Sequence, residues 1–169
     1  METTTTTPRA WVGCLGCYNE GRLNGAWVEG EEAGDISRAV TLNGEKCATC
    51  GADEFWVFDH EGYEGTLKGE CSPMEAQEKA ELLTSVEDSE REMWRAWLSN
   101  GCEADPDAMR DAYFGEFSSD VEFAEYLVQE SGLLEGASDT LSRYFDFEAY
   151  ARDLMFDFWE SDGHYFRNM

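Results

Sequence analysis

The chain of 169 residues is strongly acidic, with 37 Asp and Glu residues against 12 Lys and Arg and a formal charge of −25. Such a charge repels phosphate groups and excludes direct binding of nucleic acid. With 42% hydrophobic residues, the chain can bury one sizeable core or a few small ones in series, which excludes a disordered acidic tail.

Acidic and aromatic residues share one stretch, from Glu103 to Asp162. It carries seventeen acidic residues, three arginines and twelve aromatic residues. Because ordering such a self-repelling segment costs free energy, we expect the rings to be buried and the carboxylates to be displayed. The first sixty residues hold ten acids and four bases, and the remainder twenty-seven and eight. This asymmetry argues against adaptation to high salt, which would spread acids evenly.

The N-terminal residues predict neither secretion nor membrane insertion. Met1 is followed by an acid and by the run Thr3 to Thr7, without a basic start or an apolar stretch, and no segment approaches membrane-spanning length. We expect residues 1–9 to be a flexible tail. We also expect a cytoplasmic protein, whose six cysteines are then reduced or metal-bound rather than disulfide-bonded.

Three short runs predict an antiparallel sheet domain over residues 10–62. AWVGC, GAWVEG and EFWVFDHEG are rich in aromatic and β-branched residues and are bounded by Gly, Asn and Asp. The residues from Asn19 to Gly25 supply the turn between the first two strands. The piece from Glu31 to Lys46 is ambiguous, because Asp35 to Leu42 fits either a short helix or a poorly paired strand.

Capping patterns after Gly69 predict a helical middle domain over residues 63–103 and an acidic α+β domain over residues 104–169. Helices are expected to begin at Ser72, Ser85, Asp105, Ser119 and Asp146. Helix ends are expected at Asn100-Gly101 and Ser131-Gly132. Asp162-Gly163 predicts a terminal β-hairpin. The predicted fold class is α+β, with a small antiparallel sheet first, helices in the middle, and helices with a hairpin last.

Two C-x-x-C knuckles form the most specific local pattern. They are Cys14-Leu15-Gly16-Cys17 and Cys47-Ala48-Thr49-Cys50, the second followed by Gly51. Each knuckle places two thiolates on one tight turn, so together they fit a structural zinc ion with all four positions filled. The alternatives are four reduced cysteines packed against the sheet, or a redox pair. Cys71 and Cys102 are isolated thiols.

Signals for catalysis are poor. His60 and His164 lack a partner in a recognisable acid–base motif, and we expect surface or packing roles for both. A calcium loop beginning at Asp105 fails, because Arg110 stands where that loop needs glycine. Paired carboxylates for glycoside hydrolysis can be chosen almost anywhere in such a composition, so they carry no information. We therefore expect a protein that is not an enzyme.

Several short motifs follow one another along the chain. They are Tyr18-Asn19-Glu20-Gly21 with Gly25-Ala26-Trp27, Asp59-His60-Glu61-Gly62, Ala112 to Phe117, Asp120 to Leu127, Tyr144 to Leu154, and Ser161 to Asn168. Together, in this order, they resemble the ArdA antirestriction family. The resemblance covers nearly the whole chain from Ala10. The two C-x-x-C knuckles are a departure, since they are not part of the family pattern.

The resemblance implies an elongated dimer of small α+β domains that mimics DNA. Such proteins occupy the DNA-binding groove of type I restriction-modification enzymes, formed by their specificity and methylation subunits. The stretch from Leu133 to Leu154 matches the family's antirestriction motif, which is associated with the dimer interface. The expected interface residues are Leu133, Leu134, Tyr144, Phe145, Phe147, Tyr150 and Leu154.

The DNA-mimic interpretation agrees with the charge. Duplex DNA carries one charge per about 1.7 Å, so the acids of one chain match roughly 60 Å of duplex and those of a dimer roughly 120 Å, an upper bound. The carboxylates expected to imitate phosphates are Asp107, Asp111, Glu116, Asp120, Glu122, Glu125, Glu130, Glu135, Asp153, Asp157 and Glu160. The alternative function is a zinc-ribbon adaptor whose acidic domain docks a basic protein, and a carboxylate hydrolase is a weaker third.

Overall fold

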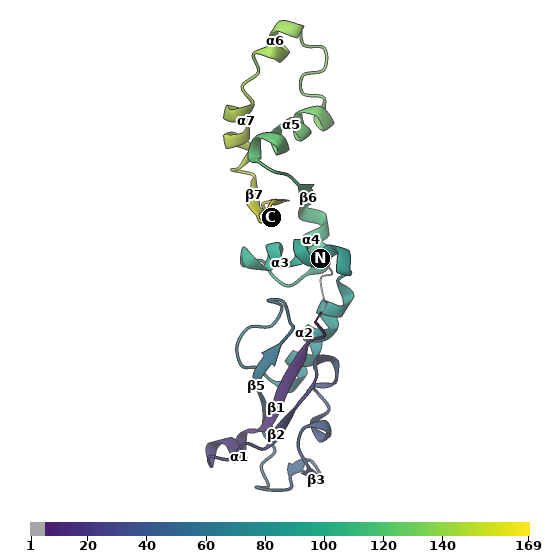
Figure 1. Ribbon diagram of the computed structural model, residues 1–169, viewed down its shortest axis with the longest axis vertical. Coiled ribbons are helices and arrows are strands. Elements are labelled where there is room, and N and C mark those ends of the chain that lie inside the picture. Colours follow the sequence, from purple (N-terminus) through teal and green to yellow (C-terminus); the bar gives the residue numbers. More distant parts are fainter. Residues whose placement is uncertain (1–5) are drawn as a thin grey trace. The chain divides into compact units, whose positions relative to one another are not determined.

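The computed structural model describes residues 6–169, which form two compact units (Figure 1). The first unit ends at Arg91, and the second runs from Glu92 to Met169. Each unit contains helices and a three-stranded antiparallel sheet. The predicted α+β class is therefore confirmed, including the N-terminal sheet, the helices in the middle, and the C-terminal helices with a β-hairpin.

The sheet of the first unit has the strand order β2-β1-β5. Its strands are β1 (Arg9–Cys14), β2 (Gly25–Glu29) and β5 (Phe55–Glu61). The central strand pairs on both sides, with Val12 opposite Ala26 of β2 and Val57 of β5. These are the three strands that the aromatic and β-branched runs predicted, because such side chains suit a pleated surface with one buried face.

One face of this sheet packs against helix α2 (Pro73–Ser85). Val12 and Val57 from the strands and Ala76 and Ala80 from the helix are all buried in the same core cluster. Ser72 caps the helix as predicted, since its hydroxyl accepts a hydrogen bond of 3.2 Å from the Glu75 amide. The small residues of α2 let the helix approach the strands closely.

The predicted helix start at Ser85 is wrong. Ser85 is the last residue of α2, and its hydroxyl donates to the carbonyl of Leu82 at 2.6 Å. The next turn, η3 (Asp88–Glu90), begins after Glu87, which forms a reciprocal capping box with Glu90. The run of good helix-forming residues before Ser85 extends α2 through that position.

The connections in the first unit contain little regular structure. They are α1 (Leu15–Asn19), the 3-10 turns η1 (Gly30–Glu32) and η2 (Ile36–Arg38), and the two-residue strands β3 (Leu42–Asn43) and β4 (Lys46–Cys47). The ambiguous piece from Asp35 to Leu42 is thus one 3-10 turn followed by the start of a minimal hairpin. The turn expected from Asn19 to Gly25 lies between β1 and β2, but α1 precedes it, directly after β1, and ends at Asn19.

The second unit surrounds a sheet with the order β6-β8-β7. Its strands are β6 (Tyr113–Glu116), β7 (Phe158–Ser161) and β8 (His164–Arg167). Its helices are α3 (Arg91–Ser99, beginning at the boundary), α4 (Pro106–Ala112), α5 (Asp120–Ser131), α6 (Asp139–Arg143) and α7 (Phe147–Leu154). The sequence predicted the hairpin of β7 and β8 but not β6 or α6.

Three helices of the second unit begin at the capping residues that the sequence predicted. Asp105, Ser119 and Asp146 each accept hydrogen bonds from first-turn amides of α4, α5 and α7. Helix α5 ends at Gly132, whose φ of 64° is left-handed. The hairpin turn at Asp162 and Gly163 has φ angles of 52° and 83°, the positive values that a two-residue turn between twisted strands requires.

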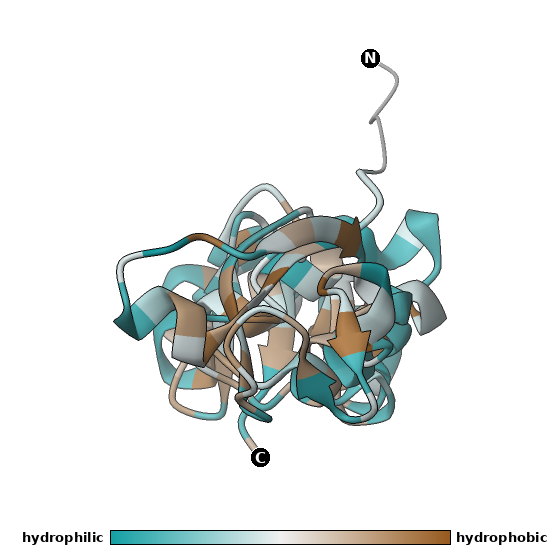
Figure 2. Ribbon diagram, turned by 90° about the horizontal axis from the view of Figure 1, so that it is seen from below, coloured by the Kyte–Doolittle hydropathy of each residue, from teal (hydrophilic) through white to brown (hydrophobic). Residues whose placement is uncertain are grey.

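Aromatic residues fill the core of the second unit. The Phe123 ring stacks on Tyr165 at a centroid distance of 4.6 Å and meets Phe158 edge-on at 5.1 Å. Trp159 stacks on Phe166 at 4.3 Å. Figure 2 shows the hydropathy of each residue, with brown stretches on the strands and teal along many helices and loops. The prediction that rings serve packing thus agrees with the structure for these residues, whereas Tyr144 and Phe156 are 80% and 81% exposed.

The three-part domain division remains a prediction, and the observed units differ from it. The stretch 63–103 divides at Arg91, because α2 packs on the first sheet. Of the predicted tail 1–9, residues 1–5 lie outside the described residues. The carbonyl of Pro8 accepts a hydrogen bond of 2.7 Å from the Gly30 amide, and Arg9 begins β1.

Candidate functional site

All eleven carboxylates expected to imitate phosphates lie in the second unit with exposed side chains. The four on α5 are Asp120, Glu122, Glu125 and Glu130. The others are Asp107 and Asp111 on α4, Glu116 at the end of β6, Glu135 after α5, Asp153 on α7, Asp157 before β7, and Glu160 within β7. Exposure is necessary for a charged recognition surface.

Helix α5 shows how the fold separates charge from packing. Phe123, Ala124 and Val128 are buried, whereas Glu122 and Glu125 are exposed. Three- and four-residue spacing places the apolar side chains on one side of the helix, so the acids between them face solvent. The same residues that build the core therefore fix the orientation of the charge.

Four of these carboxylates also serve the local structure. Asp120 accepts a hydrogen bond of 2.7 Å from the Tyr165 hydroxyl, and Glu160 accepts one of 2.6 Å from the Gly163 amide. Glu122 accepts from both the amide and the hydroxyl of Ser118, each at 2.6 Å. Asp107 forms an ion pair with Arg110 at 3.2 Å.

These contacts shift two pKa values in the second unit. The Ser118 side-chain and backbone hydrogen bonds hold the pKa of Glu122 below its ordinary value. Burial, with the hydrogen bond to Asp120 and the charges of nearby carboxylates, raises the pKa of the Tyr165 hydroxyl. Glu122 is thus stabilised as an anion and Tyr165 as a neutral donor, which preserves the negative surface.

Negative charge is also present on the first unit. When the chain is divided after Arg91, the first unit holds nineteen acidic and seven basic residues, which gives a charge of −12. The second unit holds eighteen acidic and five basic residues, which gives a charge of −13. The asymmetry seen on division at residue 60 is therefore much smaller between the structural units. Sequence reasoning missed the exposed acids Glu75, Glu78 and Glu81 of α2. Counting charge along the helix that Ser72 begins would have found them.

The seven residues expected at a dimer interface are not buried in the single chain. Leu133 is 51% exposed and Tyr144 is 80% exposed, and the other five are half-buried. Leu141, which the sequence analysis did not select, is 66% exposed. Phe145 packs against Phe147 and Tyr150 with ring centroids 4.8 and 5.5 Å apart. Apolar side chains therefore remain accessible around α6 and α7.

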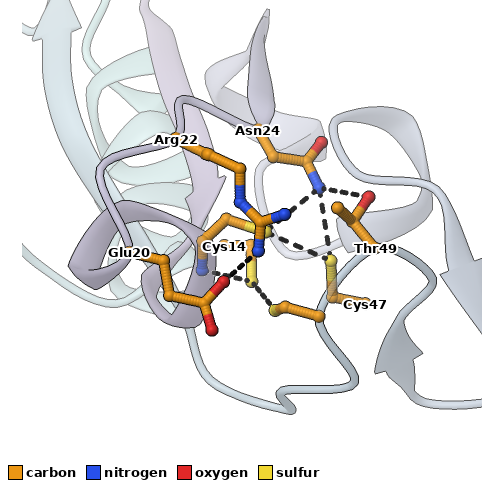
Figure 3. A network of polar contacts seen from close by, with 8 residues as sticks. Cys14, Glu20, Arg22, Asn24, Cys47 and Thr49 are labelled. Carbon is orange, nitrogen blue, oxygen red and sulfur yellow. Dashed lines mark hydrogen bonds and ion pairs between the residues drawn. The ribbon is translucent and has the colours of Figure 1, made fainter.

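The four predicted metal ligands lie together in the first unit (Figure 3). Cys14 ends β1, Cys17 lies in α1, Cys47 lies in β4 and Cys50 follows on the next turn. The sulfur of Cys14 lies 3.4 Å from that of Cys50, the sulfur of Cys17 lies 3.8 Å from that of Cys47, and all four lie within 4.8 Å of one another. Three are buried and Cys50 is half-buried. These four cysteines, the cysteine cluster, can hold a metal ion.

Hydrogen-bond donors surround the cysteine cluster. The Asn24 amide donates to the sulfur of Cys47 at 3.2 Å and to that of Cys17 at 3.6 Å. Figure 3 shows the Asn24 side chain pointing toward Cys47. The backbone amide of Cys17 donates to the sulfur of Cys14 at 3.5 Å. Sequence reasoning missed Asn24, because no motif links this residue to the cysteines that precede and follow it in the chain. The same view includes the ion pair of Glu20 with Arg22 at the edge of this network.

The thiols of the cluster have different acidities. Burial raises the pKa of Cys14 to about 12 and also raises that of Cys17. Burial acts in the same direction on Cys47, but the backbone amides of Cys50 and Thr49 and neighbouring thiols donate to its sulfur and lower its pKa to about 6. The cluster therefore stabilises one thiolate, the form of cysteine that binds metals.

No second cluster of this kind exists within residues 6–169: the four cysteines are the one group of three or more close Cys, His, Asp and Glu side chains. Asp105 instead caps α4. His164 is buried and its Nδ1 lies 3.0 Å from the Tyr113 hydroxyl, while His60 meets Tyr63 edge-on at 5.5 Å. Both histidines thus take part in packing, as expected.

Comparison with known proteins identifies the family. A family model described as "Antirestriction protein (ArdA)" matches residues 10–166. No curated protein matches the chain. No helix of the described residues combines the length and apolar character needed to cross a membrane. Because the match covers nearly the whole chain, the resemblance seen in its motifs is confirmed: the chain belongs to the ArdA family of antirestriction proteins.

Proposed function

We propose that this protein is a non-enzymatic inhibitor that competes with DNA for type I restriction-modification enzymes in the cytoplasm. Its carboxylates imitate duplex phosphates and occupy the groove formed by the specificity and methylation subunits. Beyond family membership, one observation supports this function: every acidic residue of the second unit is exposed, while rings such as Phe123, Phe158 and Tyr165 pack together in its core.

The charge of the second unit suits a DNA-binding groove. Its net charge of −13 resides on 78 residues, and the first unit adds −12. An enzyme groove lined by Lys and Arg holds counterions that an acidic ligand displaces, so binding gains the entropy of their release. Many exposed carboxylates also speed the encounter by electrostatic steering. Both effects weaken as salt screens the charges.

We also propose that two copies of the chain associate through the stretch from Leu133 to Leu154. Its exposed apolar side chains, above all Leu133, Leu141 and Tyr144, support this interface. Exposing such groups to water is unfavourable, and a second copy would cover them. A dimer would double the number of carboxylates in one ligand.

Displacement of DNA tests the inhibitor. A type I methylation core is bound to labelled duplex at low salt, and the purified protein is added. We expect stoichiometric release of the duplex, and a steep loss of this competition as salt rises. Duplex that stays bound at stoichiometric protein and low salt would contradict the function. An adaptor of basic proteins, the alternative function, would not release DNA from this core.

Two charge variants locate the mimic surface. The first neutralises Asp111, Glu116, Glu125 and Glu130 in the second unit as Asn or Gln, avoiding the carboxylates with structural partners. The matched control neutralises the exposed Glu45, Glu54, Glu70 and Glu78 of the first unit as Gln, an equal change of charge. We expect the first variant to lose more inhibition than the control, with both still folded by circular dichroism. Equal losses would mean that total charge, and not the second unit, determines binding.

A further inference from the structure

We propose that Cys14, Cys17, Cys47 and Cys50 bind one zinc ion, and that this ion folds the segment of residues 36–52 onto the N-terminal sheet. The site uses no carboxylate, so the proposal does not rest on the DNA-mimic function.

The positions of the four sulfurs fit a tetrahedral ion. A zinc–sulfur bond of about 2.3 Å in tetrahedral geometry places sulfurs about 3.8 Å apart. The observed separations are 3.4 Å between Cys14 and Cys50 and 3.8 Å between Cys17 and Cys47, with all four sulfurs within 4.8 Å of one another. Both close pairs join one knuckle to the other. A single ion would therefore bond to all four sulfurs at once.

The donor set selects the metal and its role. Four thiolates are soft ligands that prefer zinc over magnesium or calcium, which take oxygen ligands. Four sulfurs also complete the tetrahedral shell and leave no position for water or substrate. Zinc binding replaces the thiol protons, which pass to solvent. The chemistry is thus that of a structural site.

Neighbouring groups are arranged to support charged sulfurs. The Asn24 side-chain amide spans Cys17 of the first knuckle and Cys47 of the second, at 3.6 and 3.2 Å. Donors of this kind orient metal ligands and stabilise their negative charge. Gly16 is also needed, because a Cβ there would lie 2.5 Å from the Cβ of Ala52 and 3.1 Å from the sulfur of Cys50. A side chain at position 16 would therefore push the first knuckle away from Ala52 and Cys50.

The segment that the ion would hold has little other support. Residues 36–52 contain one 3-10 turn and a hairpin of two-residue strands. Around the cysteines, Val40 is the one other fully buried member of this core cluster among the described residues, and the remaining apolar side chains are half-buried. So small an apolar cluster offsets little of the entropy lost on ordering the segment. Metal binding supplies the missing free energy, as in other small zinc folds.

Metal analysis of the purified full-length protein tests the site directly. We expect one zinc per chain by mass spectrometry, and Co²⁺ added to the stripped protein should give the intense visible absorption of tetrahedral thiolate coordination. Cys47→Ser should abolish both signals. Cys71→Ser and Cys102→Ser, which remove thiols outside the cluster, should retain them. Absence of metal together with a featureless Co²⁺ spectrum would overturn the proposal, as would disulfides linking these cysteines.

Hydrogen exchange tests the structural role. Stripping the metal should speed amide exchange in residues 36–52 while leaving α5 unchanged. Unchanged exchange in that segment would refute the role in folding even if zinc binds. Asn24→Ala should weaken zinc binding by about 10- to 100-fold, the usual effect of losing a hydrogen bond to a ligand. Asn43→Ala, an exposed asparagine of β3, is the matched control. None of these readouts involves a restriction enzyme, so they fail or succeed separately from DNA displacement.

Discussion

The two units build their cores from side chains of different size. In the first unit the core consists largely of small residues such as Ala10, Val12 and Ala80, with Tyr63 as its one buried ring among the described residues. In the second unit, large rings such as Phe123 and Phe166 are fully buried. Each large ring removes much more apolar area from water than an alanine or valine does.

This difference shows two ways to stabilise a small, highly charged unit. The second unit offsets repulsion between its acids with a few large buried rings. The first unit relies on close approach of backbone and small side chains, and it contains the cysteine cluster where apolar burial is least. Removing atoms should therefore damage the second unit most, and adding atoms should damage the first.

The largest effect is expected from removing a ring of the second unit. Phe123→Ala should lower its free energy of unfolding by about 3–5 kcal/mol, since the buried ring contacts Phe158 and Tyr165 and leaves a cavity. Urea titration followed by NMR signals of each unit measures this. Phe156→Ala, at a ring that is 81% exposed, should change little. Equal losses in the two variants would contradict the described core.

Adding one methyl group should destabilise the first unit. A Cβ at Gly30 would lie 2.7 Å from both the Tyr63 hydroxyl and the Ala80 Cβ. Gly30→Ala should therefore cost about 1–3 kcal/mol of unfolding free energy through overpacking. Tyr63→Phe in the same chain gives more room, so the double variant should recover part of the loss in a double-mutant cycle. A fully additive cycle would show that the contact is not the cause.

Helix caps should be equivalent in the two units. Ser72 and Ser119 each accept a hydrogen bond of 3.2 Å from an amide three residues later. Replacing either serine with alanine should cost about 1 kcal/mol of unfolding free energy in its own unit. Denaturation of each variant measures the loss, and Ser89→Ala, at an exposed serine within η3, is the control. A much larger loss at one cap would mean that its helix depends on more than this bond.

The smallest expected effect is on a surface carboxylate. Ser118 lowers the pKa of Glu122, so the carboxylate contributes stability above its unfolded pKa, and this is lost as pH falls through the folded pKa. Ser118→Ala should raise the pKa of Glu122 in a carboxyl NMR titration. Asp35 in the first unit, whose pKa is lowered by Ser37, should keep its value in that variant. An unmoved Glu122 would contradict the described hydrogen bonds.

Much of the fold could be predicted because its signals are local. Strands β1, β2 and β5 follow from aromatic and β-branched runs, and α2, α4, α5 and α7 follow from their capping residues. Strand β6 could not be predicted, because Gly115 weakens the pattern and its pairing depends on β8, about fifty residues later. Helix α6 is too short for a periodic signal.

The two candidate sites also differ in how far they could be predicted from the sequence. The four cysteines were found because their spacing encodes two tight turns, and the structure brings all four together. The division of charge between the two units was harder to predict from the sequence. The boundary at Arg91 depends on contacts between distant segments, and it places α2 with its acids in the first unit. The position of Asn24 next to the cysteines could be recognised only from the structure, which places the start of β2 beside them.

The hairpin of β7 and β8 also bears on the order of folding. Its strands are joined by Asp162 and Gly163, and Trp159 stacks on Phe166 directly across the pair. Strand β6 must close a loop of about fifty residues to reach β8. Short loops close faster and at lower entropic cost, so we expect the hairpin to form early and β6 to dock late. Replacing Trp159 should then slow folding, whereas replacing Tyr113 should mainly speed unfolding.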